Sequence, residues 1–272
     1  MENIIGNSEA KEIMLEILRD FDFFCRENQL KYYLAYGTLL GAVRHNGYIP
    51  WDNDIDVWMP RPDYIKFREL SRYKQIKPNL KILDYRYEDS FPFIKITDSR
   101  TSLKEKYFVT EKNVGLYIDV FPLDIINDDS RLINKVFNRN YLYLRVFAGC
   151  TIRFNTGRTI VKRIIKCLIY PFFRLISKRK ICHKIDDVYT SYQIDRNKPL
   201  VYANFVWGGK NPFINTYPIE WFNEVIEVDF EGFRFIAPKC YDKILTKRYG
   251  DYMTIPPVEE QISHFYEVKW KH

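Results

Sequence analysis

The chain has 272 residues, of which 46% are hydrophobic and 28% are charged, a composition that excludes disordered, collagen-like and low-complexity proteins. The formal net charge is +7, and the 17% aromatic content suits sugar or nucleotide surfaces, although large cores also use aromatic residues. Five scattered cysteines without a CxxC pair, no visible signal peptide and no apolar run long enough to span a bilayer predict a cytoplasmic protein without disulfides.

Hydrophobic spacing and capping residues predict alternating helices and strands in the first half of the chain. A helix is expected over residues 8–28 with Ser8 as its N-cap, and a short helix over 38–43 with Thr38 as its cap. A third helix opens at Pro60 and runs to about residue 73. Strands are expected over 32–36, 55–59, 80–85, 93–97 and 115–121, the last of them ending before Pro122.

The second half contains a basic segment, a predicted hairpin over 225–228 and 233–236, and a helix over 241–249. We therefore predict an α/β (α+β) fold, a mixed sheet flanked by helices. Residues 131–180 hold 13 Lys and Arg and no Asp or Glu, interleaved with apolar residues. Such a segment suggests a helical insertion that contacts an anionic membrane surface; nucleic acid is the rival partner and is not expected here, and a solvated helix face is the plainest alternative.

Three aspartates at alternate positions, Asp52, Asp54 and Asp56, are the most informative pattern in the sequence. Alternate residues of a strand share one face, so Asp54 and Asp56 would direct their carboxylates to one point. Converging carboxylates favour Mg²⁺, with Mn²⁺ as a possible substitute. An EF-hand calcium site is excluded, because Val57 and Asp63 stand at the positions where that loop requires glycine and glutamate. Simple capping would account for one carboxylate and not for three.

A second acidic strand is predicted around Asp119, which lies between Ile118 and Val120. A carboxylate in such apolar surroundings needs a partner, so Asp119 would complete the metal site, act as a general base, or be satisfied by backbone donors. Asp124, after Pro122, is expected in a loop or as a cap.

Phosphate contacts are expected near the start of the short helix. Gly37 and Thr38 lie where free backbone N–H groups attract phosphate, and Arg44, His45 and Lys95 are expected to contact phosphate as well. The four histidines show no spacing typical of a zinc site.

The stretch from Tyr36 to Val57, with GTLLGAVRH, GYIPWD and DIDV, resembles the signature of the LicD family, which includes bacterial phosphocholine transferases and is related to fukutin-type ribitol-phosphate transferases. The blocks KITDSRT, GLYIDVFPLD and APKCYDKILTKRYGDYM follow in family order, so the resemblance covers roughly residues 20 to 265 and is weakest over 131–180.

The resemblance implies a nucleotidyltransferase-like fold with a catalytic core over 1–130, the basic helical segment over 131–190 and a region over 191–272 that completes the substrate site. It implies that Gly37 and Thr38 form a phosphate turn. It also implies that Asp54, Asp56 and Asp119 are the catalytic carboxylates, and that the same three residues bind the metal with Asp52 as an outer ligand. A loop with Trp207, Gly208 and Gly209 would shape the pocket.

The implied reaction moves a phospho-alcohol, phosphocholine first, from a CDP-linked donor to a hydroxyl of a lipid-linked glycan precursor at the inner face of the membrane, and releases CMP. Ribitol phosphate or glycerol phosphate are alternative groups. Nucleotidyl transfer uses the same turn and carboxylates, and a scaffold with structural aspartates is the non-catalytic alternative.

Overall fold

The computed structural model describes residues 4–86, 91–105, 114–151, 172–206, 211–261 and 266–271. The helices are α1 (Asn7–Glu27), α2 (Tyr36–His45), α3 (Arg61–Leu70), α4 (Ser130–Thr151), α6 (Lys178–Asp186) and α7 (Tyr241–Tyr249), with short 3₁₀ helices at Asp187–Ser191, Pro212–Asn215, Ile219–Phe222 and Val258–Glu260. The strands are β1 (Tyr33–Leu34), β2 (Asp56–Pro60), β3 (Leu80–Leu83), β4 (Ile94–Asp98), β5 (Thr101–Glu105), β6 (Tyr117–Asn127), β7 (Leu200–Ala203), β8 (Thr216–Pro218), β9 (Val225–Phe230), β10 (Phe233–Pro238) and β11 (Tyr266–Trp270).

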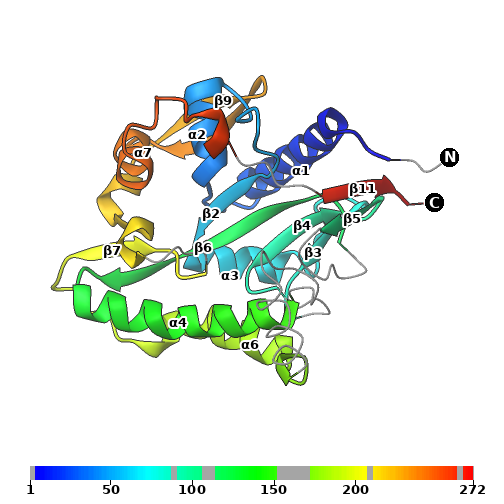
Figure 1. Cartoon of the computed structure of the whole chain (residues 1–272). Helices are drawn as coiled ribbons and strands as arrows, with labels where there is room; N and C mark the ends of the chain where they lie inside the picture. Colours follow the sequence, from blue (N-terminus) through cyan, green and yellow to red (C-terminus); the bar gives the residue numbers. More distant parts are fainter. Residues whose placement is uncertain are drawn as a thin grey trace.

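The main sheet has the order β1-β2-β6-β4-β3, and β6 runs through its middle (Figure 1). Strands β2 and β6 are parallel, whereas β1 with β2, β4 with β6 and β3 with β4 are antiparallel. The far half of β6 pairs with β7, which in turn pairs with β8. Two small sheets, β9 with β10 and β5 with β11, complete the described strands. The predicted mixed α/β fold is therefore confirmed.

Helices α1 and α3 pack against each other on one face of the main sheet. The apolar spacing of α1 buries Ile13, Ile17 and Phe21, and the rings of Phe21 and Phe67 meet edge to face at 5.4 Å. Each large apolar side chain buried in this way contributes about 1.5–3 kcal/mol. This packing leaves the opposite face of β2 and β6 to α2 and to the C-terminal part of the chain.

A network of buried ion pairs fastens α3 and α6 to β6. Arg61 pairs with Asp124 at 2.6 Å and with Asp186 at 2.6 Å, and Arg68 pairs with Asp186 at 2.9 Å and with Asp84 at 2.6 Å. All five side chains are at most 7% exposed. The network joins segments more than 100 residues apart in the chain.

Asp124 therefore corrects one sequence prediction. It lies within a strand, buried beside Arg61, and not in a loop. The prediction that β6 ends before Pro122 is wrong as well, because the strand continues to Asn127. On the side away from β2, residues 117–120 pair with β4 and residues 124–127 with β7, so Pro122 falls in the interval between two partners. A proline without an N–H is tolerated at such an interval.

The two predicted helix caps are also wrong. Helix α1 begins after Gly6, so Ser8 lies inside its first turn, and α2 begins at Tyr36 after Ala35 and not at Thr38. Helix α3 ends at Leu70, and β5, β7, β8 and β11 were not predicted. The hairpin β9–β10 and helix α7 are confirmed.

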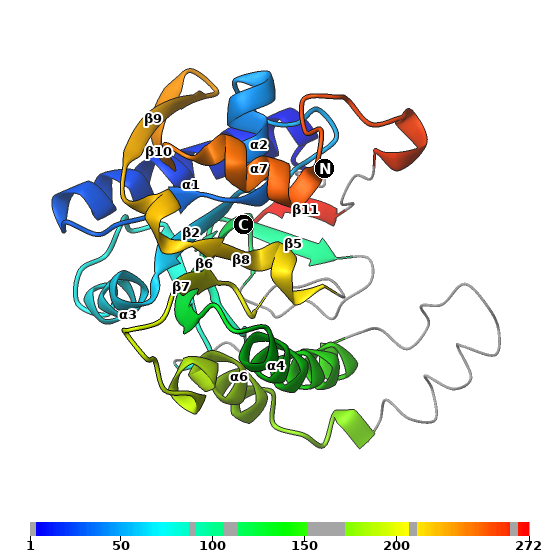
Figure 2. The ribbon, with the colours of Figure 1, turned by 90° about the vertical axis from the view of Figure 1, so that its left-hand side faces the viewer.

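The basic segment is described for residues 131–151 and 172–180 only; the other residues of that prediction lie outside the described part of the chain. Helix α4 packs along α6 on the lower side of the molecule (Figure 2). Among the described residues, no helix is both long enough and apolar enough to cross a bilayer.

Candidate active site

Three charged residues lie in one row across the central strands. Asp56 on β2 stands opposite Asp119 on β6, and Asp119 stands opposite Lys95 on β4. Side chains at directly paired positions lie on the same face of a sheet, so all three project from one face. Trp58 and Phe121 share that face by alternation, and their rings lie 4.9 Å and 5.6 Å from that of Tyr36 at the start of α2. The row therefore lies on the face that α2 partly covers.

The ammonium group of Lys95 connects the row. Its Nζ lies 2.6 Å from Oδ1 of Asp119, and the two side chains are 8% and 15% exposed. The same Nζ lies 3.6 Å from the ring centre of Tyr117, which holds the cation by its electron-rich face. The expectation that a carboxylate at position 119 needs a partner is confirmed, and the partner is a lysine.

Asp54 lies in the segment that leads into β2, and its carboxyl group is close to that of Asp52. Burial raises the pKa of Asp54 well above its ordinary value, and the charges of Asp52 and Asp119 raise it further. Burial likewise raises the pKa of Asp56, with Asp54 the next cause, while Lys95 opposes both shifts. The structure thus gathers the carboxylates that the sequence predicted, in surroundings where their negative charges repel one another.

Gly37 and Thr38 hold these carboxylates in place. A Cβ atom on Gly37 would come within 2.4 Å of Oδ2 of Asp52, so only glycine lets this carboxylate approach the first turn of α2. The hydroxyl of Thr38 accepts a hydrogen bond of 2.8 Å from the backbone N–H of Asp56. Both residues contact the aspartate segment, whereas their binding of phosphate stays a prediction.

Arg44 and His45 lie at the other end of α2. Arg44 donates to the backbone oxygen of Tyr252 at 2.7 Å and to Nε2 of His45 at 3.0 Å. Burial lowers the pKa of His45, and the neighbouring guanidinium lowers it further. In this position Arg44 fastens the segment after α7 to α2, and a role for either residue in phosphate binding stays a prediction.

The donor set suits a hard divalent cation, because carboxylate oxygens are the ligands that Mg²⁺ prefers. In the described ranges of the chain, however, no three His, Cys, Asp or Glu side chains surround a common metal position. Binding an ion would require the carboxylates to turn toward it, and Asp119 to exchange or share its contact with Lys95. The metal ligands Asp52, Asp54, Asp56 and Asp119 therefore stay a prediction whose donor chemistry fits the site.

Arg248 and Tyr249 of α7 were not predicted from the sequence as site residues. The guanidinium of Arg248 lies 4.2 Å from the ring centre of Tyr36, where α7 packs against α2. Tyr249, the next residue of α7, is 39% exposed. The only signal for them in the sequence was the block APKCYDKILTKRYGDYM, which contains both residues but no pattern typical of catalytic residues. Trp207, Gly208 and Gly209 lie outside the described residues.

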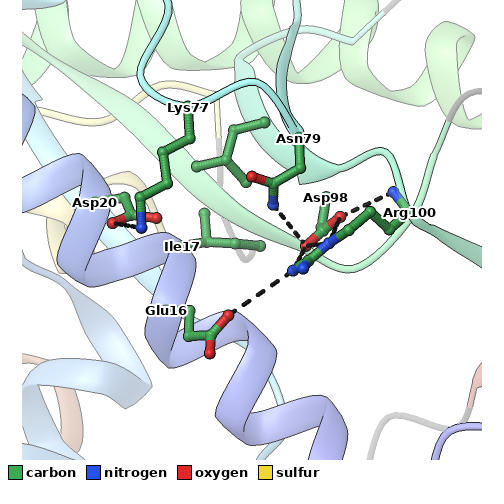
Figure 3. A pocket seen from close by; sticks show the side chains of 8 residues that line it. Glu16, Ile17, Asp20, Lys77, Asn79, Asp98 and Arg100 are labelled. Carbon is green, nitrogen blue, oxygen red and sulfur yellow. Dashed lines mark hydrogen bonds and ion pairs between the residues drawn. The ribbon is translucent and has the colours of Figure 1, made fainter.

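A hollow between α1 and the strands β3 and β4 is lined by charged side chains that pair with one another (Figure 3). Lys77 pairs with Asp20 at 2.6 Å, and Arg100 pairs with Asp98 at 2.5 Å and reaches Glu16 at 3.8 Å. Both cations of this hollow are paired with carboxylates, so the row of Asp56, Asp119 and Lys95 is the stronger candidate.

Comparison with known proteins decides the family. Residues 29–145 match the model of the LicD/FKTN/FKRP nucleotidyltransferase domain. The chain is 31% identical over 265 residues to the lipopolysaccharide cholinephosphotransferase LicD of Haemophilus influenzae, and the match covers 94% of each chain. This chain belongs to the LicD family. It is therefore a LicD-type phosphotransferase with a nucleotidyltransferase-like fold, as the sequence resemblance implied.

Shorter matches reach other proteins. An uncharacterized protein of Rickettsia typhi is 33% identical over 127 residues, which cover 45% of this chain and 38% of that protein. Mannosyltransferase regulator 4 of Saccharomyces cerevisiae is 28% identical over 142 residues, which cover 48% of this chain and 11% of that protein.

Proposed function

We propose that the protein transfers phosphocholine from CDP-choline to a hydroxyl group of a cell-surface glycan precursor, such as lipopolysaccharide, teichoic acid or capsule, and releases CMP. The observation that carries the proposal is the row of Asp56, Asp119 and Lys95, with Asp54 beside it, in a chain that matches a lipopolysaccharide cholinephosphotransferase over 94% of its length.

In this reaction the acceptor oxygen forms a bond to the phosphorus of phosphocholine. The bond from that phosphorus to the bridging oxygen breaks, and its electron pair leaves with CMP. The proton of the acceptor passes to a carboxylate of the site, and Asp119 serves either as this base or as a metal ligand. Bound Mg²⁺, held by Asp54 and Asp56, would neutralise charge on the phosphates, since phosphoryl transfer depends on positioning and charge neutralisation. Lys95 holds Asp119 in register beside Asp56.

The test is CMP release from CDP-choline in the presence of Mg²⁺ and a lipid-linked glycan acceptor, with CDP-ribitol and CDP-glycerol in parallel. The substitution Asp54→Asn keeps the shape of the side chain and removes its charge, so we expect it to lower the rate by a factor of at least about 100. Asp229→Asn is the matched control, because Asp229 is 57% exposed on β9 and pairs only loosely with Arg234 at 3.7 Å.

Each outcome assigns the reaction. Release that prefers CDP-ribitol or CDP-glycerol would keep the chemistry and change the transferred group. Pyrophosphate release from a nucleoside triphosphate, with no CMP from any CDP-alcohol, would instead assign nucleotidyl transfer. Equal activity of Asp54→Asn and the wild type would refute a catalytic role for the aspartates and favour the scaffold alternative.

We also propose peripheral contact with an anionic membrane through residues 131–180. The support is an exposed surface that combines basic and apolar side chains. Arg139 and Arg145 on α4 are exposed, and Leu142 between them is 61% exposed. Beyond α4, Leu175 is 83% exposed next to Arg174. Basic and apolar groups together bind anionic lipid surfaces, at about 1 kcal/mol per basic residue near the surface.

Flotation with lipid vesicles tests this contact. We expect binding to phosphatidylglycerol vesicles that falls at high salt and is weakened by the double substitution Arg139→Gln and Arg145→Gln, with little binding to phosphatidylcholine. Equal recovery with both lipids, or in the double variant, would leave the basic segment as a solvated face.

A further inference from the structure

Arg248 is partly exposed with a buried Nε, and it differs from the buried Arg61 and Arg68 because no carboxylate pairs with it among the residues that the structure describes. Arg61 and Arg68 are each held by two aspartates. The Nη1 atom of Arg248 donates instead to Oδ1 of Asn215 at 2.5 Å, a neutral acceptor. Its positive charge is therefore oriented by the protein but not neutralised by it.

The position of this charge relates it to the acidic row. The guanidinium lies 4.2 Å from the ring centre of Tyr36, the residue directly before Gly37 and Thr38. Thr38 in turn holds the backbone of Asp56. The next residue along α7, Tyr249, lies within electrostatic range of Asp56 and Asp52.

Polar atoms without partners concentrate around Arg248. Its Nε, the hydroxyls of Tyr36 and Tyr217 and the indole nitrogen of Trp58 are buried without a well-aligned hydrogen bond within the described residues, although Tyr36 contacts Trp58 and Tyr217 contacts Arg248. Tyr36 also has φ at +46°, a value that is strained for an aromatic residue. Unsatisfied buried groups cost about 1–3 kcal/mol each, and they and strained residues concentrate at functional sites.

The charges of the site show what this cation could bind. Four aspartates, Asp52, Asp54, Asp56 and Asp119, lie near two ammonium groups, that of Lys95 beside Asp119 and that of Lys11 on the side of Asp52, so negative charge exceeds positive charge here. A donor with a pyrophosphate group brings further negative charge to this surface. A planar guanidinium forms paired hydrogen bonds with phosphate oxygens, and it remains charged at every pH of interest.

We propose that Arg248 binds the phosphate groups of the nucleotide-linked donor, an inference that rests on the proposed function. When the bond between the transferred phosphorus and the bridging oxygen breaks, the electron pair stays on the phosphate of the leaving nucleotide. That phosphate gains negative charge, and the N–H groups of Arg248 stabilise it without transferring a proton. Asn215 orients the guanidinium through its bond to Nη1.

Binding measurements by titration calorimetry test the assignment without any acceptor. The full-length protein is titrated with CDP, with inorganic pyrophosphate and with cytidine, all with Mg²⁺, as wild type, Arg248→Gln and Arg248→Lys. Arg234→Gln is the control, since Arg234 is 57% exposed on β10. Because cytidine carries no phosphate, it reports on the remainder of the site.

We expect Arg248→Gln to weaken the binding of CDP and of pyrophosphate by at least about tenfold and to leave the binding of cytidine unchanged. Arg248→Lys should restore part of the lost affinity. If the affinities for CDP and for cytidine fall by the same factor, Arg248 only supports Tyr36, and the assignment is wrong. Unchanged CDP binding, or no binding of CDP and pyrophosphate to the wild type, overturns it as well. If Arg248→Gln does not fold, the ratio of CDP to cytidine affinity in Arg248→Lys decides.

This design separates the two proposals. A selective loss of CDP and pyrophosphate binding in Arg248→Gln, together with no CMP release from any CDP-alcohol by the wild type, would refute the proposed reaction and leave Arg248 as a phosphate ligand. Normal CMP release by Arg248→Gln would instead support the proposed reaction and refute the role of Arg248 as a phosphate ligand.

Discussion

Asp186 is the central acceptor of the buried ion network, and its substitution gives the sharpest test of the packing. Its side chain is fully buried and accepts from Arg61 at 2.6 Å, from Arg68 at 2.9 Å and from the hydroxyl of Tyr85 at 2.9 Å. In Asp186→Asn the charge disappears, and each guanidinium keeps one aspartate, Asp124 or Asp84. Removing one partner from a buried pair costs about 3–5 kcal/mol, a large share of the 5–15 kcal/mol typical of a folded domain.

Urea unfolding of the wild type and of Asp186→Asn measures this loss of stability. The control is Asp187→Asn, the neighbouring residue, whose side chain is 29% exposed and pairs with two exposed side chains, His183 at 2.5 Å and Arg86 at 3.7 Å. An exposed pair of this kind contributes only about 0–1 kcal/mol. If the two variants differ by less than 1 kcal/mol in their free energies of unfolding, the argument from buried charge is wrong.

Acid titration of stability tests the same group independently. Burial alone would raise the pKa of Asp186, but Arg61 and Arg68 outweigh it and lower the pKa to about 2. The unfolded chain has a value of about 3.9, so the contribution of Asp186 is present above pH 4 and is lost as the pH falls toward 2. The shift corresponds to about 3 kcal/mol. The difference in stability between the wild type and Asp186→Asn should therefore shrink over this range, and a constant difference would contradict the assignment.

Two further substitutions test the site. In Gly37→Ala the new Cβ would lie 2.4 Å from Oδ2 of Asp52, so we expect displacement of this carboxylate and a loss of activity of at least about tenfold, measured as CMP release. In Lys95→Met the cation that opposes the raised pKa values of Asp54 and Asp56 is gone, so these groups protonate at higher pH and the acid limb of the profile of kcat/KM against pH should move to higher pH. An unmoved acid limb would refute the coupling.

Both substitutions have matched controls. Gly6→Ala should be silent, because a Cβ there meets nothing within 4 Å. Lys81→Met removes an exposed lysine from β3, on the far side of β4, and should leave the pH profile unchanged.

The sequence predicted the aspartates of the site because alternation on a strand is a local pattern. It also predicted that Asp119 needs a partner, but the identity of that partner depends on the register between β4 and β6, which no local pattern reveals. Asp124 was assigned to a loop because Pro122 resembles the end of a strand, and only the change of partner from β4 to β7 explains why the strand continues. The division of the chain at residues 130 and 190 stays a prediction.

Arg248 shows the limit of local reasoning in another way. Its contacts with Tyr36 and Asn215 join positions 212 and 33 residues apart in the chain. A lone arginine on a short helix is most often a solvated surface charge, and only the packing of α7 on α2 distinguishes this one.

The central place of β6 has a consequence for how the protein is made. Strands β2 and β4, which carry Asp56 and Lys95, leave the ribosome before β6, yet in the finished sheet β6 lies between them. Until it arrives, each has an edge without a partner, and exposed edges invite pairing with other chains. The row of Asp56, Asp119 and Lys95 is thus completed by a late, long-range pairing event, so a truncated or stalled chain that contains the whole aspartate motif should be inactive and prone to aggregate.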